Sequence, residues 1–313
     1  MRAVAVRAFR AAPERIEIPR PEVGSGEVGV RVQAAGMNPF DAKIADGVLD
    51  GHRPHRFPLV LGTDGAGVVD SIGPDVHRFR VGDRIFGQFL HDPVGIGTYA
   101  EFSTTPESIG VTQVPTGLSA TEAAALPTAG MTALHALDLL GLSAGEWLLI
   151  VGASGGVGSF ATQFAHAQGL HVIAAVRPDA AERSRRLGAD ETVDVGPGLP
   201  AAVAALRPGA VDGLLDLMSP AASFGALARL VRPGGKAATT IWAADPASAS
   251  SPGVAQVNVN LQPSAPLLER AVQLVASHRL AIPVERRIPL DDAPTALAEI
   301  RAGHARGKTV IDL

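Results

Sequence analysis

The chain has 313 residues, 46% of them hydrophobic, which is enough for two compact domains with a core each. Its formal net charge is -4 and its basic residues are scattered, so the sequence lacks the positive footprint of a nucleic-acid-binding protein. The absence of cysteine excludes disulfides, thiolate nucleophiles and every cysteine-ligated metal site.

The amino terminus, MRAVAVRAFR, alternates like a strand and lacks the charged stub and apolar stretch of a signal peptide. No run of about 18 apolar residues follows, so no membrane-spanning helix is predicted. These features favour a cytoplasmic protein whose partner is a small molecule.

The amino-terminal part of the chain is rich in Gly and Pro and contains short alternating segments, such as Val28–Val32, Gly67–Ser71 and Thr98–Ser103. This pattern predicts small antiparallel strands joined by turns. From about Thr121, Ala-rich helical stretches alternate with apolar segments of strand character. Four such strands are expected, and they predict a doubly wound parallel sheet in an α/β domain: Trp147–Val151, His171–Val176, Val211–Leu217 and Lys236–Ile241.

A glycine-rich turn, VGASGGVG at 151–158, joins the first of these strands to a helix. Its glycines lie three apart, where a tight turn, close approach to a pyrophosphate and close helix packing each favour loss of the side chain. The amides at the helix start would face the phosphates. An ordinary strand-to-helix turn is the alternative. We predict a dinucleotide site formed by Gly152, Ser154, Gly155, Gly156, Val157 and Gly158.

The end of the second strand indicates which nicotinamide cofactor binds. NAD enzymes usually carry Asp or Glu at this place to hold the ribose hydroxyls. Here Val176 is followed by Arg177, whose guanidinium can pair with a 2′-phosphate, so NADPH is predicted. In the alternative interpretation, Arg177 is a solvated loop residue and Asp179 or Glu182 holds the ribose.

After about Asp245 the sequence predicts helices at Ala265–Ser277 and Ala293–Ala302 and a closing strand at Thr309–Leu313. We expect this tail to return to the first domain.

Seven segments together resemble the medium-chain dehydrogenase/reductase superfamily, in its zinc-free quinone oxidoreductase and enoyl reductase branch. The segments are AAGMNPFDAKIADG at 34–47, GTDGAG at 62–67, VGDRIFG at 81–87, GTYAEF at 97–102, ALPTAGMTALHAL at 125–137, VGASGGVG at 151–158 and HARGKTVIDL at 304–313. The resemblance implies a GroES-like, mainly β catalytic domain formed by 1–120 and 260–313, with a Rossmann domain at 121–259 inserted, and it implies a homodimer.

Zinc-dependent relatives place metal ligands where Asn38, Thr63 and Asp64 stand, with a further ligand near Ala124. None of these four residues is a Cys, His or Glu, so catalysis without a metal is expected. The resemblance puts Asn38 and Asp41 near the nicotinamide. A neutral amide can donate to an enolate or quinone oxygen, although Asn before Pro is also a common turn residue. For Asp41 the favoured role is a brace of that loop.

By the same resemblance, Thr128 presents a hydroxyl to the nicotinamide, although a Thr after Pro127 can also cap a helix. Thr240 and Ile241 would line the nicotinamide pocket, since ligands bind at strand ends in such sheets. Arg306 and Lys308 belong to the family's closing motif, and Lys308 is assigned to the cofactor, with a solvated or strand-bracing role left open.

We therefore expect an NADPH-dependent, zinc-free reductase of a quinone or an α,β-unsaturated carbonyl, with the proton delivered by solvent. The sequence does not choose between these acceptors. Two alternatives are kept: an NADPH-binding structural or regulatory protein without turnover, and an enoyl reductase acting on carrier-linked chains.

Overall fold

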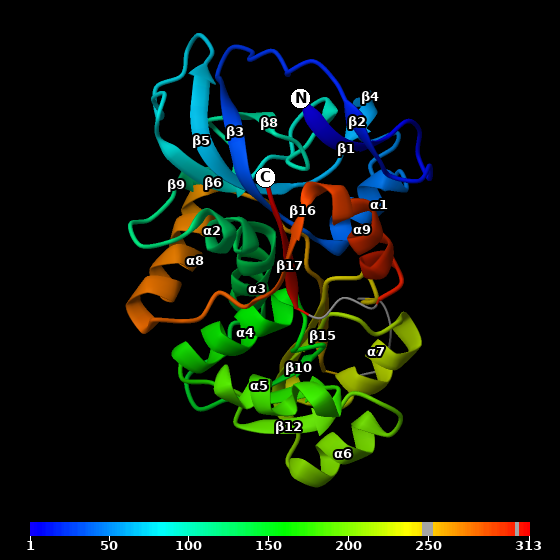
Figure 1. Cartoon of the computed structure of the whole chain (residues 1–313). Coiled ribbons are helices and arrows are strands. Elements are labelled where there is room, and N and C mark those ends of the chain that lie inside the picture. Colours follow the sequence, from blue (N-terminus) through cyan, green and yellow to red (C-terminus); the bar gives the residue numbers. More distant parts are fainter. Residues whose placement is uncertain (246–252, 304–306) are drawn as a thin grey trace. The chain divides into compact units, whose positions relative to one another are not determined.

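The computed structural model describes residues 1–245, 253–303 and 307–313 (Figure 1). Arg306 therefore lies outside the described residues. The chain divides into two compact units. The first comprises Met1–Ala129, Pro263–Val272 and Ile282–Leu313, and the second comprises Gly130–Gln262 and Gln273–Ala281.

Two sheets make up most of the first unit within the described residues. One has the strand order β2-β1-β4-β7 and the other has the order β16-β17-β3-β5-β6-β9, with β8 paired to β3. The strands are β1 (Arg2–Val6), β2 (Glu14–Glu17), β3 (Glu27–Gly36), β4 (His55–Val60), β5 (Asp64–Ile72), β6 (Arg84–Gln88), β7 (Val94–Ile96), β8 (Phe102–Pro106), β9 (Val111–Gln113), β16 (Val284–Pro289) and β17 (Lys308–Asp312).

Strand β17 brings the carboxyl-terminal tail back to the first unit, as expected. It pairs antiparallel with β3, where Ile311 lies opposite Ala35. Short helical segments complete this unit: α1 (Pro39–Ala45), α2 (Ala120–Ala125), η2 (Leu290–Asp292) and α9 (Ala293–Arg301). Helices α1 and α9 contribute Ile44 and Leu297 to one buried cluster, so the tail shares a core with the amino-terminal strands.

One predicted strand is displaced along the chain. The segment Thr98–Ser103 is predicted as a strand, but β8 begins only at Phe102, and before it Ala100 forms an isolated bridge with Ala3. The preceding residues turn their polar groups inward, because the Thr98 hydroxyl donates to the Asp64 carbonyl and the Tyr99 hydroxyl donates to the Asp41 carboxylate. Buried polar groups need such partners, and here those partners take precedence over continuous strand pairing.

The second unit contains a six-stranded parallel sheet within the described residues, in the order β12-β11-β10-β13-β14-β15. Numbered by chain position, this order is 3-2-1-4-5-6, the arrangement of dinucleotide-binding sheets. The strands are β10 (Trp147–Val151), β11 (His171–Val176), β12 (Glu191–Asp194), β13 (Val211–Asp216), β14 (Val231–Thr239) and β15 (Ala255–Asn258). The sequence predicts the four central strands but not the partly exposed edge strands β12 and β15.

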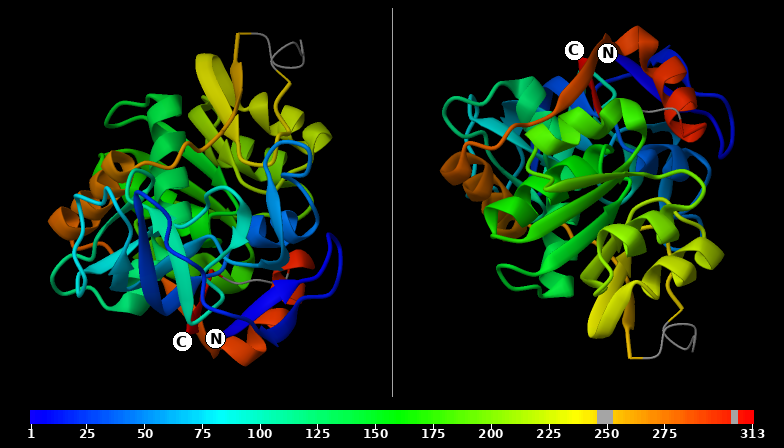
Figure 2. Two further views of the ribbon diagram at one scale, coloured as in Figure 1. Left: turned by 90° about the horizontal axis from the view of Figure 1, so that it is seen from above. Right: turned by 90° about the horizontal axis from the view of Figure 1, so that it is seen from below.

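Helices cover both faces of this sheet (Figure 2), as parallel strands with right-handed crossovers require. They are α4 (Gly156–Ala167), η1 (Pro178–Ala180), α5 (Ala181–Arg186), α6 (Leu199–Leu206) and α7 (Ala221–Ala228). Helices α3 (Pro127–Leu140) and α8 (Ala265–His278) have residues in both units. Among the described residues, no helix combines the length and apolar character needed to cross a bilayer.

Candidate active site

A buried polar cluster in the first unit is built around the start of α1. Asn38 precedes the helix in an extended conformation, Pro39 opens it, and Asp41 is its third residue. The Asp41 carboxylate turns back to accept a hydrogen bond from the backbone N–H of Asn38 at 2.8 Å. This is a local cap that the sequence N-P-F-D favours, because proline needs no donor at a helix start and an acid at the third position can satisfy an amide N–H.

Both carboxylate oxygens of Asp41 also accept hydrogen bonds from residues outside α1. Its Oδ1 accepts from the Thr63 N–H at 3.0 Å and the Thr63 hydroxyl at 2.9 Å, and its Oδ2 accepts from the Tyr99 hydroxyl at 2.7 Å. Burial raises the pKa of Asp41 to about 6 from the ordinary 3.8, although the hydrogen bond from Tyr99 opposes this rise. These contacts support the role of Asp41 as a brace, joining α1 to the segments before β5 and β8.

Asp64, at the start of β5, forms the second centre of the cluster. Its carboxylate accepts from the Asn38 side-chain amide at 2.9 Å, the Thr128 hydroxyl at 2.6 Å and the Thr128 N–H at 3.1 Å. The Thr128 hydroxyl also accepts from the Gln88 amide at 2.7 Å. Burial raises the pKa of Asp64, and the charge of Lys308 opposes this effect.

Lys308, at the start of β17, brings a cation into the same cluster. Its side chain is 2% exposed, and Nζ donates to Asn38 Oδ1 at 2.8 Å and to the Met37 carbonyl at 3.1 Å. The Asp64 carboxylate lies 3.7 Å away. Burial lowers the pKa of Lys308, and the two carboxylates oppose this. The sequence assigned this lysine to the cofactor, yet its donors are directed at groups within the first unit.

The cluster does not fit a zinc ion. Hydrogen bonds do bring Asn38, Thr63 and Asp64 together, but an amide and a hydroxyl stand where zinc requires imidazole or thiolate. The ammonium of Lys308 beside Asp64 would also repel a divalent cation. Over the described part of the chain, no three His, Asp or Glu side chains form a group that could hold a metal.

The glycine-rich turn of the second unit has the geometry of a phosphate cradle. Gly152 has φ +82, which favours glycine, and Gly155 precedes α4 as its N-cap. A Cβ on Gly158 would lie 2.4 Å from the Gly152 carbonyl oxygen, so this position excludes any side chain. The first turn of α4, which includes Gly156 and Val157, offers amide N–H groups that the helix itself does not use.

Two arginines follow the neighbouring strand β11 along the chain, and one of them contacts this turn. Arg177 follows β11, the direct neighbour of β10, and its side chain is 47% exposed. Its nearest carboxylate oxygen is that of Asp179, 3.9 Å from Nε. From α5, Arg183 donates to the Ser154 carbonyl at 2.6 Å and so brings a second guanidinium to the turn. The sequence offered Arg183, together with Arg185 and Arg186, as an aid to phosphate binding, but several arginines on one helix usually form a solvated face.

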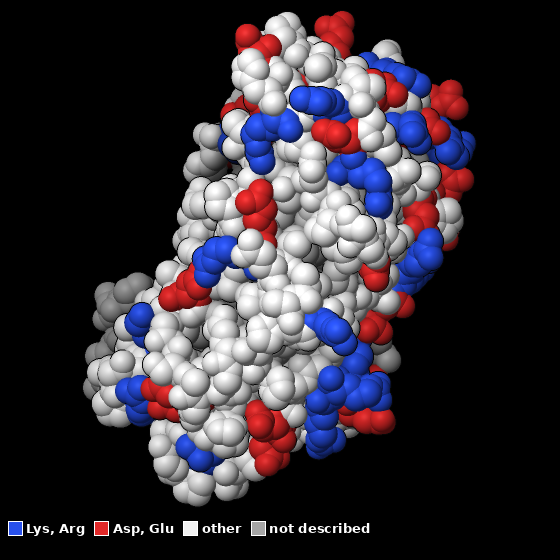
Figure 3. Space-filling model, turned by 90° about the vertical axis from the view of Figure 1, so that its left-hand side faces the viewer, with Lys and Arg blue, Asp and Glu red and all other residues white. Residues whose placement is uncertain are grey.

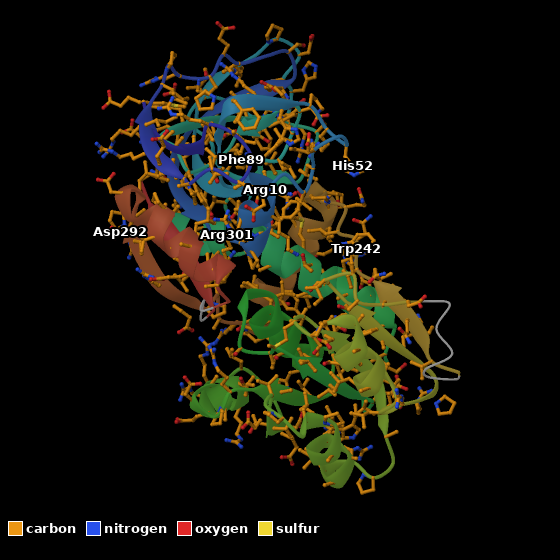
Figure 4. All side chains as sticks on the ribbon, turned by 90° about the vertical axis from the view of Figure 1, so that its right-hand side faces the viewer. Arg10, His52, Phe89, Trp242, Asp292 and Arg301 are labelled. Carbon is orange, nitrogen blue, oxygen red and sulfur yellow. The ribbon has the colours of Figure 1, made fainter. Side chains whose placement is uncertain are left out.

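The predicted nicotinamide segment lies at the same edge of the sheet, on the other side of β10. Thr240 and Ile241 directly follow β14, and the Thr240 N–H donates to the Asp216 carbonyl at 3.3 Å. Trp242 comes next, with 66% of its surface exposed and φ +62, a left-handed conformation that is rare for a bulky residue (Figure 4). In the strand order of the sheet, Arg177 and this segment follow strands on opposite sides of β10, the strand that leads into the glycine-rich turn.

Two parts of the chain match known protein families. Residues 24–116 match the alcohol dehydrogenase GroES-like domain, and residues 187–311 match the zinc-binding dehydrogenase family. The chloroplast envelope quinone oxidoreductase homolog of Arabidopsis thaliana is 32% identical over 316 residues, covering 96% of this chain and 94% of that protein. The mitochondrial NAD(P)H oxidoreductase RTN4IP1 of Mus musculus is 32% identical over 328 residues, covering 92% and 82%.

Solved structures are similar to this chain over nearly its whole length. The quinone oxidoreductase from Coxiella burnetii has a TM-score of 0.88 and 26% identity, covering 100% of this chain and 99% of its own. The mycobacterial protein Rv1454c complexed with NADPH has a TM-score of 0.85 and 25% identity, covering 99% and 100%.

Proposed function

The chain belongs to the medium-chain dehydrogenase/reductase superfamily, in its quinone oxidoreductase-like branch, and on this premise we propose that it is an NADPH-dependent reductase of quinones or α,β-unsaturated carbonyls. The observation that carries this proposal is the glycine-rich turn of 152–158, which cannot hold a side chain at Gly158 and which Arg183 contacts. Such a turn with cationic groups beside it suits a diphosphate and a further phosphate on the ribose.

Arg177 supports NADPH over NADH. The last residues of β11 carry no acid, while the exposed guanidinium of Arg177, which directly follows the strand, can pair with a 2′-phosphate. One structural neighbour is itself a complex with NADPH. The competing interpretation, in which Asp179 or Glu182 holds the ribose of NADH, predicts the opposite preference.

When bound, NADPH would supply the hydride, and the protein's task is to stabilise the charge that appears on the acceptor. Asn38 is the proposed donor to the enolate or hydroquinone oxygen, since its neutral amide gives an N–H without exchanging a proton. Thr128 is proposed to face the nicotinamide from the start of α3. Asp41 positions α1 and with it Asn38. A proton from solvent would complete the reduction.

Trp242 favours a flat, conjugated acceptor. An indole that stays exposed in a left-handed conformation costs conformational energy, and such costs tend to persist where a ligand uses them. Its ring offers a face on which an aromatic or quinonoid ring can stack. On the face shown in Figure 3, acidic and basic side chains are interspersed, which gives no special support to a carrier-protein substrate.

Stopped-flow oxidation of bound NADPH, followed across quinones, enones and a carrier-linked enoyl thioester, tests the proposal. We expect turnover with a quinone or enone. Saturable NADPH binding without turnover of any acceptor would instead indicate a structural or regulatory protein, and turnover of the thioester alone would indicate the enoyl reductase alternative. The cytoplasmic location stays a prediction, because the names of two relatives place those proteins in the chloroplast envelope and the mitochondrion.

A further inference from the structure

Lys308 is the buried member of the chain's three lysines. Removing an ammonium from water is unfavourable unless other groups replace the lost hydration. Here three groups do so, namely the Met37 carbonyl, the Asn38 Oδ1 atom and the Asp64 carboxylate. Two of these three groups, those of Met37 and Asn38, belong to the segment that carries the proposed donor. We therefore ask how Lys308 affects the Asn38 side chain.

The pairing fixes the orientation of the Asn38 amide. An ammonium only donates hydrogen bonds and an ionised carboxylate only accepts them, so Oδ1 must face Lys308 and Nδ2 must face Asp64. The flipped amide would place donor against donor and acceptor against acceptor. The opposite charges on its two sides therefore make the observed orientation the one of lower energy.

One N–H of Asn38 is left over. The side-chain amide has two, and Asp64 takes one of them at 2.9 Å. Within the described residues, the structure gives the second Nδ2–H no partner. The ammonium on Oδ1 draws electron density from the amide, which strengthens this remaining donor in a poorly solvated site.

We propose that Lys308 is a positioning residue: its ammonium, opposite the Asp64 carboxylate, holds and polarises the Asn38 amide so that the second N–H serves the acceptor oxygen. This role rests on the proposed reductase function. It differs from the assignment of Lys308 to the cofactor, and the two assignments predict different kinetics.

Lys308→Met keeps an unbranched side chain of similar length and removes its positive charge. We expect the Kd for NADPH to stay within about twofold of wild type while kcat falls roughly 10- to 100-fold, because a weakened oxyanion donor acts on the transition state. Lys43→Met, which removes an exposed lysine of α1, is the matched control and should keep wild-type kcat. Loss of NADPH affinity with unchanged kcat would make Lys308 a cofactor ligand and overturn the proposal.

A double-mutant cycle tests whether Lys308 acts through Asn38. Asn38→Ala should lower kcat on the order of 10²-fold, and adding Lys308→Met should lower it little further. Multiplicative losses would show that the two residues act independently, which contradicts a positioning role.

Spectroscopy tests the geometry without turnover. The chain has three asparagines, Asn38, Asn258 and Asn260, so asparagine-selective 15N labelling gives three side-chain amides, and Asn38→Asp identifies the first. Lys308→Met should move the Asn38 resonances and leave the other two in place. An unmoved Asn38 signal would refute the proposal even if no acceptor is ever found, whereas a moved signal without turnover would refute only the reductase function.

The wild-type protein provides a measurement if Lys308→Met does not fold. With 13C-labelled lysine, the Lys308 ε-carbon reports its own titration, in a site that also holds Asp64 and Asp41, the latter hydrogen-bonded by Tyr99. The Asn38 amide resonances should shift with the same midpoint, below the ordinary pKa of lysine. An Asn38 amide that does not respond to this titration would overturn the proposal.

Discussion

At the scale of single residues, the buried charges of Asp64 and Lys308 differ in their surroundings from the exposed charge of Arg177. Asp64 and Lys308 are both buried and lie 3.7 Å apart, and each also bonds the same amide. Arg177, by contrast, is exposed and follows a strand end that lacks an acid. The first arrangement orients a side chain inside the first unit, and the second is open to a ligand of the second unit.

Arg177→Ala tests the cofactor preference. Because a charge-assisted contact with a 2′-phosphate contributes about 1.5–3 kcal/mol, the Kd for NADPH should rise roughly 10- to 100-fold. The Kd for NADH should change less than about twofold, as measured by fluorescence titration. Arg186→Ala, which removes an arginine paired with Glu182, is the control. Equal losses for both coenzymes would remove Arg177 from the proposed role.

The pH dependence of stability tests the buried carboxyl of Asp41. Its folded-state pKa is raised from 3.8 to about 6, so the folded state holds this proton more tightly than the unfolded state. The contribution to stability is fully present below pH 3.8 and is lost as the pH rises through about 6, a change on the order of 3 kcal/mol.

Urea unfolding of wild type and Asp41→Asn across this range isolates that contribution. The difference in unfolding free energy, wild type minus variant, should fall between pH 4 and pH 7, because the variant cannot ionise. A difference independent of pH would contradict a raised pKa at Asp41.

At the scale of elements, the turn between β10 and α4 contains glycines with different surroundings. Gly158 packs against the backbone of Gly152 and Ala153, whereas a Cβ on Gly155 would meet one atom, the Gly152 carbonyl oxygen, at 3.4 Å. The two glycines therefore serve different purposes within one turn. Gly158 allows the helix to approach the strand, and Gly155 leaves space in front of the helix.

Gly158→Ala and Gly155→Ala should separate these purposes. The first forces backbone atoms apart and should lower the unfolding free energy by about 1–3 kcal/mol, with loss of NADPH binding. The second should keep near wild-type stability and weaken NADPH binding more than tenfold, since its methyl group occupies the pyrophosphate's approach. Denaturation and coenzyme titration of both variants give the answer. Unchanged NADPH affinity in Gly155→Ala would place the diphosphate elsewhere.

At the scale of the whole molecule, the expected fold is confirmed. A GroES-like segment and a Rossmann-like parallel sheet are both present, and the family matches cover parts of each. The parallel sheet ends in two edge strands, β12 and β15, within the described residues. Edge strands carry unpaired backbone groups that can pair with another copy.

We predict a homodimer formed through an edge of this sheet. Sedimentation equilibrium should give about twice the chain mass of 32.1 kDa. Val257→Lys in β15 should shift the species toward monomer if that edge is used. A wild-type monomer at all concentrations would rule out this prediction.

Local patterns in the sequence were sufficient to predict the central strands of the parallel sheet. The predicted strands Trp147–Val151 and His171–Val176 have the bounds of β10 and β11, because buried parallel strands are continuous apolar runs that need no context to recognise. Gly169 comes just after the C-cap of α4 and has φ +80, the left-handed conformation in which a glycine commonly ends a helix. Edge strands β12 and β15 escaped prediction, since their half-exposed residues carry no such pattern.

The sequence by itself determined the fold class, the family and the place of the glycine-rich turn, since each depends on spacing within a short stretch of chain. Only the tertiary structure decided the partners of Asn38, because these come from positions 64 and 308, far apart along the chain. Hydrogen bonds and buried charges depend on distance in space, and no periodicity in the sequence records that distance. For this reason the sequence could suggest Asn38 as a donor, while the fold was needed to show what orients it.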